Sequence, residues 1–103
     1  MRRQVDLGAT YAPSEDIVAR EIVGEVVIVP LAAGIGDMED ALYSLNETGR
    51  AIWDRLDGVK SLRDVAAELA QVYDTPRQEI EQDVIGLVGE LLTRSMLVEV
   101  SNS

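Results

Sequence analysis

The feature that most constrains this chain is a strand pattern that runs directly into a capped helix. Tyr43 and Leu45 alternate with a polar residue, which is the period-two pattern of a half-buried strand. Asn46 follows at once, and its side-chain oxygen can accept a hydrogen bond from a free N–H of the first helical turn. Apolar residues then recur at helical spacing until Gly58, a residue type that readily takes the left-handed conformation at helix ends. The sequence therefore predicts that a strand and a helix meet at Asn46 without a linker.

Two further strands are predicted upstream of this junction. Ile17–Ile22 is the first, Val23-Gly24-Glu25 is predicted to be a turn, and Val26–Val29 is a run of β-branched residues. Together they predict a β-hairpin. The third strand covers Ala41 to Leu45, after a loop over residues 30–40 that is rich in glycine and acidic residues. Because the second strand is apolar throughout, we expect it to be covered on both faces or to lie at the centre of the sheet.

Three helices are predicted after the sheet. The third has the strongest start signal, in which Thr75 is the N-cap and Pro76 the first helical residue. The predicted helices run from Glu47 to about Asp57, from the Ser61 cap to Asp74, and from Pro76 to about Ser95, and a short strand can follow over Met96–Val100. The predicted fold class is α+β and winged-helix-like, with a three-stranded antiparallel sheet followed by three helices. The predicted core residues are Ile52, Trp53, Leu56, Val65, Leu69 and Val84.

The length of 103 residues suits one domain with a small core. We expect residues 1–15 to form a flexible N-terminal arm, because Gly8 and Pro13 interrupt any pattern there, and residues 16–100 to form the domain. No apolar run approaches the roughly 20 residues that a membrane span needs. No apolar segment follows the basic residues near the N-terminus, so secretion is not expected and the expected location is the cytoplasm.

Cysteine and histidine are both absent from the sequence. This excludes disulfides, thiolate metal sites and nucleophilic chemistry that depends on Cys or His. Asp37, Glu39 and Asp40 could bind a hard cation, but they lie in a predicted loop without fixed spacing, and a solvated acidic loop is the simpler interpretation. We therefore expect no catalysis, no bound metal and no cofactor.

The formal net charge of −10, from 19 acidic and 9 basic residues, disfavours contact with phosphate backbones. A winged-helix transcription regulator would need a basic recognition helix. The third predicted helix instead carries Arg77 and Arg94 among several acidic residues, so we expect no nucleic-acid partner. The acidity would suit a basic peptide or a basic enzyme surface, although solubility alone is the simpler explanation. The acidic residues of this helix are Glu79, Glu81, Asp83 and Glu90.

The order and spacing of several short segments resemble the PqqD family over roughly residues 17–98. The matching segments are Leu45-Asn46-Glu47-Thr48-Gly49, Ile52-Trp53, Asp57-Gly58, the run from Leu62 to Leu69 with Tyr73, and Asp83-Val84. The resemblance implies a peptide chaperone, also called a RiPP recognition element. Such proteins bind the leader of a ribosomally made precursor peptide and present it to a modifying enzyme, often a radical-SAM protein. Coenzyme PQQ biosynthesis and other pathways, including lasso-peptide leader binding, both remain open.

A peptide-binding surface is predicted between the third strand and the third helix. An edge strand leaves free N–H and C=O groups to which an extended peptide can add. The third helix is apolar over a wide arc, with a ridge from Ile80 to Leu91 and further apolar residues beside it, so part of it is either exposed or covered on a second side. The resemblance implies that the peptide lies in this position. Carried over by position, the peptide-binding residues are Ala41, Leu42, Tyr43, Ser44, Leu45, Ile80, Asp83, Val84, Leu87 and Glu90.

Gly86 and Gly89 are unusual inside a predicted helix, where each costs roughly 1 kcal/mol relative to Ala. A helical wheel places both on the polar side, away from the apolar ridge. They are either tolerated there or allow close approach of a partner enzyme or a second copy. Weak alternation of Val5, Leu7 and Tyr11 could also pair with a second copy, so a homodimer is left open.

Overall fold

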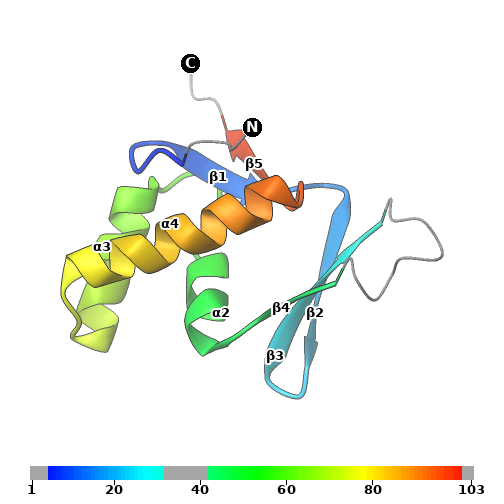
Figure 1. Ribbon diagram of the computed structural model, residues 1–103, viewed down its shortest axis with the longest axis horizontal. Coiled ribbons are helices and arrows are strands. Elements are labelled where there is room, and N and C mark those ends of the chain that lie inside the picture. Colours follow the sequence, from blue (N-terminus) through cyan, green and yellow to red (C-terminus); the bar gives the residue numbers. More distant parts are fainter. Residues whose placement is uncertain (1–4, 32–41, 101–103) are drawn as a thin grey trace.

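The computed structural model describes residues 5–31 and 42–100, whose elements form an α+β arrangement (Figure 1). The β2–β3 hairpin extends away from the helices, and α4 crosses the molecule beside α3. The strands are β1 (Thr10–Pro13), β2 (Ile17–Ile22), β3 (Glu25–Pro30), β4 (Tyr43–Leu45) and β5 (Leu97–Val100), and the helices are α2 (Glu47–Trp53), α3 (Leu62–Tyr73) and α4 (Arg77–Thr93). The predicted fold class is confirmed for its three-stranded antiparallel sheet and its helices.

The three-stranded sheet has the order β2-β3-β4, with both pairs antiparallel. The hairpin prediction is confirmed, and β3 lies at the centre, as its apolar run indicated. Val26 pairs with Leu45 and Ile28 pairs with Tyr43. Paired residues share a face of a sheet, and Val26, Ile28 and Leu45 are all buried, so this face packs on the core. Strand β4 consequently lies at an edge of the sheet.

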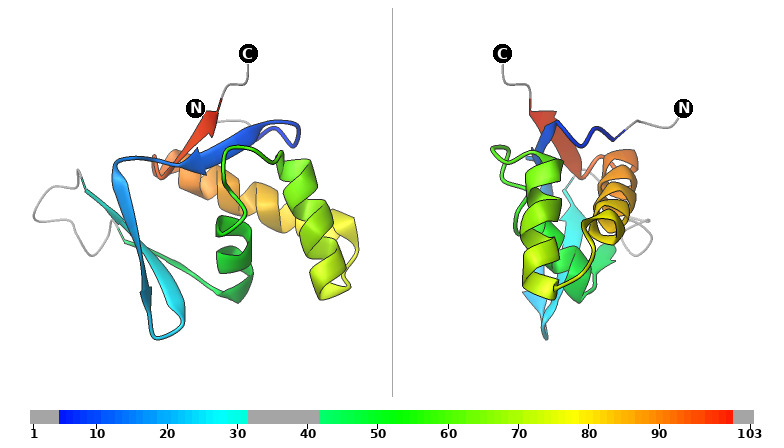
Figure 2. Two further views of the ribbon diagram at one scale, coloured as in Figure 1. Left: turned by 180° about the vertical axis from the view of Figure 1, so that it is seen from behind. Right: turned by 90° about the vertical axis from the view of Figure 1, so that its left-hand side faces the viewer.

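A second sheet, which the sequence did not predict, pairs β1 with β5 in antiparallel register (Figure 2). Residues 10–13 are therefore not part of a flexible arm, and that prediction is wrong for them. Tyr11 is buried in the core, and the N–H of Gly58 donates to the Tyr11 carbonyl at 2.9 Å. The predicted strand near the C-terminus is confirmed as β5, and its partner is the segment that we expected to be irregular.

The helix caps follow the sequence in two of three cases. The Asn46 side chain accepts a hydrogen bond from Gly49 N–H at 2.7 Å, and the Ser61 hydroxyl accepts one from Asp64 N–H at 3.2 Å. The prediction of Thr75 as an N-cap is wrong, because its hydroxyl donates backwards to the Tyr73 carbonyl at 3.1 Å. Pro76 occupies the cap position of α4 and has no side-chain acceptor to offer.

Helix α2 is shorter than predicted and ends at Trp53 instead of near Asp57. The N–H groups of Arg55 and Leu56 bond to carbonyls three residues earlier, those of Ile52 and Trp53. This is the tighter bonding pattern of a 3₁₀ turn, which often follows the last turn of an α-helix. The tightening lets the chain reach Gly58, whose φ of +79° reverses its direction towards α3.

All six predicted core residues are buried. The core also contains residues that the prediction missed, among them Tyr11, Met96 and Leu97 beside the second sheet. The wide apolar arc of α4 is explained by this sheet, because Val88 and Leu92 are buried as well as Val84. Among the apolar residues that extend the arc beyond the ridge, only Ile85 stays accessible, with 38% of its surface exposed. Helix α4 is thus covered by its own domain on two sides.

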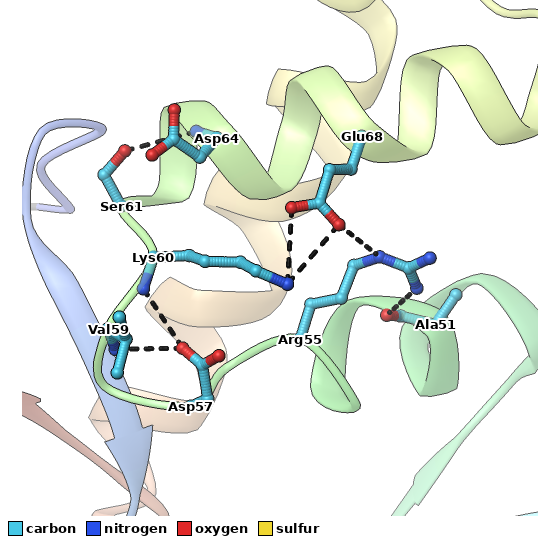
Figure 3. Close-up of polar contacts among 8 residues, drawn as sticks. All are labelled: Ala51, Arg55, Asp57, Val59, Lys60, Ser61, Asp64 and Glu68. Carbon is cyan, nitrogen blue, oxygen red and sulfur yellow. Dashed lines mark hydrogen bonds and ion pairs between the residues drawn. The ribbon is translucent and has the colours of Figure 1, made fainter.

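Ion pairs join the segment that follows α2 to α3 (Figure 3). The Glu68 carboxylate lies 3.4 Å from Arg55 Nε and 3.3 Å from Lys60 Nζ, and Arg55 also donates to the Ala51 carbonyl at 3.1 Å. In the connecting loop, Asp57 accepts hydrogen bonds from the backbone N–H groups of Lys60 and Val59, which lower the pKa of its carboxyl group. These contacts fix the orientation of α2, whose first turn reaches the candidate site.

Candidate functional site

A groove of about 380 Å³ lies between β4, the start of α2 and the middle of α4. We call it the β4–α4 groove. Strand β4 and helix α2 follow one another in the sequence, whereas α4 comes from further along the chain, and the groove forms where α4 passes beside the edge strand β4 (Figure 1). The groove is lined by Tyr43, Ser44, Leu45, Asn46, Thr48, Gly49, Ile52, Asp83, Gly86 and Leu87.

One side of the groove is the outer edge of β4. The strand pairs with β3 on its other side only. Within the part of the chain that the structure describes, no backbone hydrogen bond outside the sheet involves Tyr43, Ser44 or Leu45. An edge strand in this state has N–H and C=O groups that can pair with another extended chain. The geometry therefore suits strand addition, in which main-chain hydrogen bonds supply affinity and neighbouring pockets select side chains.

Apolar side chains lie beneath the groove, whose accessible lining is mostly polar. Leu45 and Ile52 are buried in the core but reach the groove, and Leu87 is half-buried on the α4 side. In the pleated strand, Tyr43 and Leu45 point to the core face, whereas Ser44 points to the opposite face and is exposed. A bound segment would thus meet the partly exposed Tyr43 and Leu87 side chains on its inner side and open solvent on its outer side.

The strand–helix junction shapes one end of the groove. A Cβ on Gly49 would lie 3.1 Å from Asn46 Oδ1 and 3.3 Å from Leu45 Cδ2, which is closer than such contacts normally are. The same Asn46 oxygen accepts the N–H of Gly49. A side chain at position 49 would push the Asn46 and Leu45 side chains aside by a few tenths of an ångström, so glycine suits the close approach of α2 to the end of β4. The Leu-Asn-Glu-Thr-Gly segment builds this corner of the groove.

The other end of the groove is bordered by charged and aromatic groups. The Arg94 guanidinium lies over the Tyr43 ring, at 4.9 Å from its centre. Arg94 Nε also donates to Glu90 Oε1 at 2.8 Å. These contacts join the last turn of α4 to the first residue of β4 and hold the two sides of the groove together.

Half of the predicted binding residues meet in the groove, namely Tyr43, Ser44, Leu45, Asp83 and Leu87. Ile80 and Val84 do not line it, because they are 4% and 0% exposed and pack in the core. Leu42 and Glu90 are accessible but lie outside the lining residues, and Ala41 falls outside the described residues.

Several lining residues were missed by the sequence analysis. Gly86 lies on the exposed side of α4, as the helical wheel indicated, and it also lines the groove, which the wheel could not show. A Cβ on Gly89 would lie 3.5 Å from Val5 Cγ2, which places that glycine beside the N-terminal segment. The sequence analysis placed three further lining residues at the strand–helix junction and one in the core, but none in the groove. The junction residues are Asn46, Thr48 and Gly49, and the core residue is Ile52. The unusual glycine within the junction was the signal that could have placed them.

The described segments contain neither a cluster of metal-ligating side chains nor a helix that could span a membrane. No group of three or more metal-ligating side chains comes together there, and the acidic loop residues Asp37, Glu39 and Asp40 lie outside these segments. No helix within residues 5–31 and 42–100 is both long enough and apolar enough to cross a bilayer.

Comparison with known proteins gives matches that include this site. The family model described as coenzyme PQQ synthesis protein D (PqqD) matches residues 25–97. A PqqA binding protein of Rhizobium meliloti (strain 1021) is 33% identical over 68% of this chain and 84% of that protein. A PqqA binding protein of Xanthomonas oryzae pv. oryzae (strain PXO99A) is 34% identical over 56% of this chain and 63% of its own length.

Two solved structures have a similar fold. Lasso peptide synthetase B1, complexed with the leader peptide, superposes with a TM-score of 0.73 and 26% identity, over 87% of this chain and 99% of that one. TbiB1 in complex with the TbiA(beta) leader peptide gives a TM-score of 0.69 and 23% identity, over 84% of this chain and 93% of that one. Both structures were determined with a peptide bound.

Proposed function

The chain belongs to the PqqD family, and on this basis we propose that it is a non-catalytic peptide chaperone. It binds the leader of a ribosomally made precursor peptide by strand addition to β4 and presents that peptide to a modifying enzyme. The modifying enzyme is of the radical-SAM type or another peptide-modifying class. The observation that carries the proposal is the free edge of β4 beside a groove that extends to α4.

Strand addition accounts for the way in which the groove is built. A peptide on the edge of β4 gains main-chain hydrogen bonds whatever its sequence. Its alternate side chains then point towards Tyr43 and Leu87, the partly exposed apolar side chains of the groove, where burial of apolar surface adds affinity. Because the walls are fixed by the sheet, the helix cap and the Arg94–Tyr43 contact, binding needs little rearrangement, which favours affinity.

A role without chemistry of its own agrees with the composition. The chain has no cysteine or histidine, and the only ionisable group among the described residues that line the groove is Asp83, apart from the Tyr43 phenol. Acid–base catalysis usually requires a positioned pair of such groups. The chemistry therefore belongs to the partner enzyme, and this chain supplies binding and orientation.

Two named peptides can test the proposal. Fluorescence anisotropy would measure the affinity of the purified chain for PqqA from Rhizobium meliloti and for the TbiA(beta) leader peptide. We expect one of them to bind, and the preferred one indicates whether the pathway is that of coenzyme PQQ or of lasso peptides. Replacing Leu87 with Ala should weaken binding by about tenfold, because it removes apolar contact in the groove. The matched change Ile85→Ala, on another face of the same helix, should leave affinity unchanged.

Strand addition has its own experimental signature. N-methylation of a peptide residue removes one main-chain N–H, so an N-methyl scan should weaken binding at alternate positions, with the period of two of an added edge strand. Backbone amide shifts in NMR spectra should change most at residues 43–45 and 83–87. Uniform effects along the scan, or shifts confined to the opposite edge strand β2, would contradict the proposed mode.

A further inference from the structure

Asp83 is the only side chain with a full charge at neutral pH among the described residues that line the β4–α4 groove. It is exposed and lies on the α4 side of the groove, whose other sides are β4 and the start of α2. Its carboxylate forms no ion pair and no side-chain hydrogen bond with any residue in the described segments. The groove therefore presents one unneutralised negative charge to whatever occupies it.

Basic residues of the domain cannot easily supply a counterion for Asp83. Arg77 pairs with Glu81 at 3.4 Å, and Arg50 pairs with Glu21 at 2.7 Å. Arg94 pairs with Glu90, and it follows Asp83 by eleven residues, which is about 16 Å along a helix. At that distance, and with its own partner, Arg94 contributes little at Asp83. None of the ion pairs in the described segments brings a cation to Asp83, so a ligand can supply one.

Gly86 provides space next to this carboxylate. Residues three apart in a helix lie on the same face, so Gly86 sits one turn beyond Asp83, and both line the groove. A Cβ placed on Gly86 would have no heavy atom within 4 Å. No steric reason within the described fold therefore requires glycine there, although glycine weakens a helix relative to alanine. Because Gly86 has no side chain, it leaves an open strip of the α4 surface next to Asp83, which we call the track.

These observations together point to one ligand feature. Resting on the function proposed above, we propose that the groove selects a leader segment with a lysine or arginine, whose alkyl stem lies over Gly86 and whose charged end binds Asp83. A long basic side chain packs its methylene groups on such a surface while its head group keeps a polar contact. The overall charge of −10 also attracts a basic segment during the encounter.

The experiment combines changes in the protein with changes in the peptide. The probe is whichever of R. meliloti PqqA and the TbiA(beta) leader binds the wild-type chain, with each lysine and arginine replaced in turn by glutamine. We expect one replacement to weaken binding to the wild type by about tenfold, because a charge-assisted hydrogen bond is lost. The same peptide replacement should not change the affinity for the Asp83→Asn variant, since the two substitutions remove the same contact.

Matched variants separate this contact from general charge and from helix stability. Glu79→Gln removes the same charge from an exposed site of α4 outside the groove, and it should change affinity by about twofold or less. Gly86→Leu should weaken binding by filling the track, whereas Gly89→Ala should not. Thermal unfolding followed by circular dichroism would establish that each variant is folded.

The outcomes distinguish the inference from the proposed function. If a peptide binds but tolerates replacement of every basic residue, or if Asp83→Asn weakens binding no more than Glu79→Gln, the inference is overturned and the proposed function stands. If neither peptide binds the wild-type chain, the proposed function is overturned and the inference with it. The contact would be established if replacing one basic peptide residue and replacing Asp83 each weakened binding tenfold, and the two replacements together weakened it no further.

Discussion

The guanidinium carbon of Arg94 lies 4.9 Å from the centre of the Tyr43 ring, within the range of a cation–π contact. Arg94 follows the last turn of α4, and Tyr43 is the first residue of β4, so the contact joins the two walls of the groove. Glu90 holds the guanidinium in place with a hydrogen bond of 2.8 Å. The groove is therefore fixed at this end by side chains, while the Asn46 cap fixes the other end.

Removing the guanidinium tests this contact. Arg94→Ala should lower the free energy of unfolding by about 0.5–1 kcal/mol, the usual contribution of an exposed cation–π pair. Urea denaturation would measure the change. Arg77→Ala is the matched control, because it removes an exposed arginine with an i,i+4 partner but no aromatic contact. An equal loss in both variants would show that the Tyr43 ring contributes nothing.

Alanine substitutions at Ile80 and Leu87 should affect stability and peptide binding differently. Ile80 packs in the core, so Ile80→Ala should lower the free energy of unfolding by about 2–5 kcal/mol, because it leaves a cavity. Leu87 is half-buried in the groove, so Leu87→Ala should cost less stability and more peptide affinity. Denaturation and anisotropy on the same samples would compare the two. If Ile80→Ala were the milder change in stability, the assignment of this residue to the core would be wrong.

The contrast between these two residues shows how far the sequence could locate the site. The periodic pattern indicated that both face inwards from α4, but it could not tell which of them is covered by the domain itself. That distinction depends on packing between distant segments, such as the β1–β5 sheet, in which the Thr10 hydroxyl donates to the Val100 carbonyl at 2.9 Å across a separation of 90 residues. A pairing between such distant segments leaves no local signal in the sequence.

Local signals were sufficient elsewhere. The hairpin of β2 and β3, the cap at Asn46 and the cap at Ser61 were all predicted, because each depends on residues within a few positions of one another. The helical wheel correctly indicated that Gly86 lies on the exposed side of α4. It could not show that this side lines a groove beside β4, because that depends on how distant segments pack together.

Replacing glycine with alanine should change the free energy of unfolding in opposite directions at two positions. Gly86→Ala should raise the free energy of unfolding by about 1 kcal/mol, because a Cβ there meets nothing and alanine is the better helix former. Gly49→Ala should lower it, because its Cβ would press on Asn46 Oδ1 and disturb the cap. Thermal melts of both variants measure the signs. Stabilisation by Gly49→Ala would contradict the close approach of α2 to β4.

Alkaline pH should weaken the fold through Tyr11. Burial raises the pKa of the Tyr11 phenol above its usual 10.0, and the nearby carboxylates of Glu99 and Asp6 act in the same direction, whereas the hydrogen bond from Asp6 N–H opposes them. A raised pKa in the folded state means that the contribution of the neutral phenol is complete below pH 10 and is lost as the pH rises above it. Unfolding titrations across this range should show the decline.

The matched test replaces the phenol without removing the ring. Tyr11→Phe should keep the core packing and reduce the decline in stability above pH 10, because no group at this position can then ionise. Tyr73→Phe, at a partly exposed residue of α3, should leave the decline as it is in the wild type. An identical pH profile for wild type and Tyr11→Phe would show that Tyr11 does not ionise in this transition.

The turn between β2 and β3 contains a strained residue. Val23 has a φ of +50° and Gly24 has a φ of +81°, so both adopt left-handed conformations. Such a two-residue hairpin turn favours Asn, Asp or Gly, since a β-branched side chain crowds the backbone there. Val23 is also 99% exposed, so its side chain gains nothing from burial in the domain. Val23→Asn should therefore raise the free energy of unfolding by about 1–2 kcal/mol.

A second valine provides the control for this prediction. Val72 is 63% exposed on α3, where its backbone is an ordinary right-handed helix. Valine and asparagine have similar helix propensities, so Val72→Asn should change stability only slightly. Urea denaturation of the two variants isolates the backbone effect, because each replaces an exposed valine by the same residue. If Val23→Asn is no more stabilising than Val72→Asn, the left-handed conformation of Val23 carries no strain.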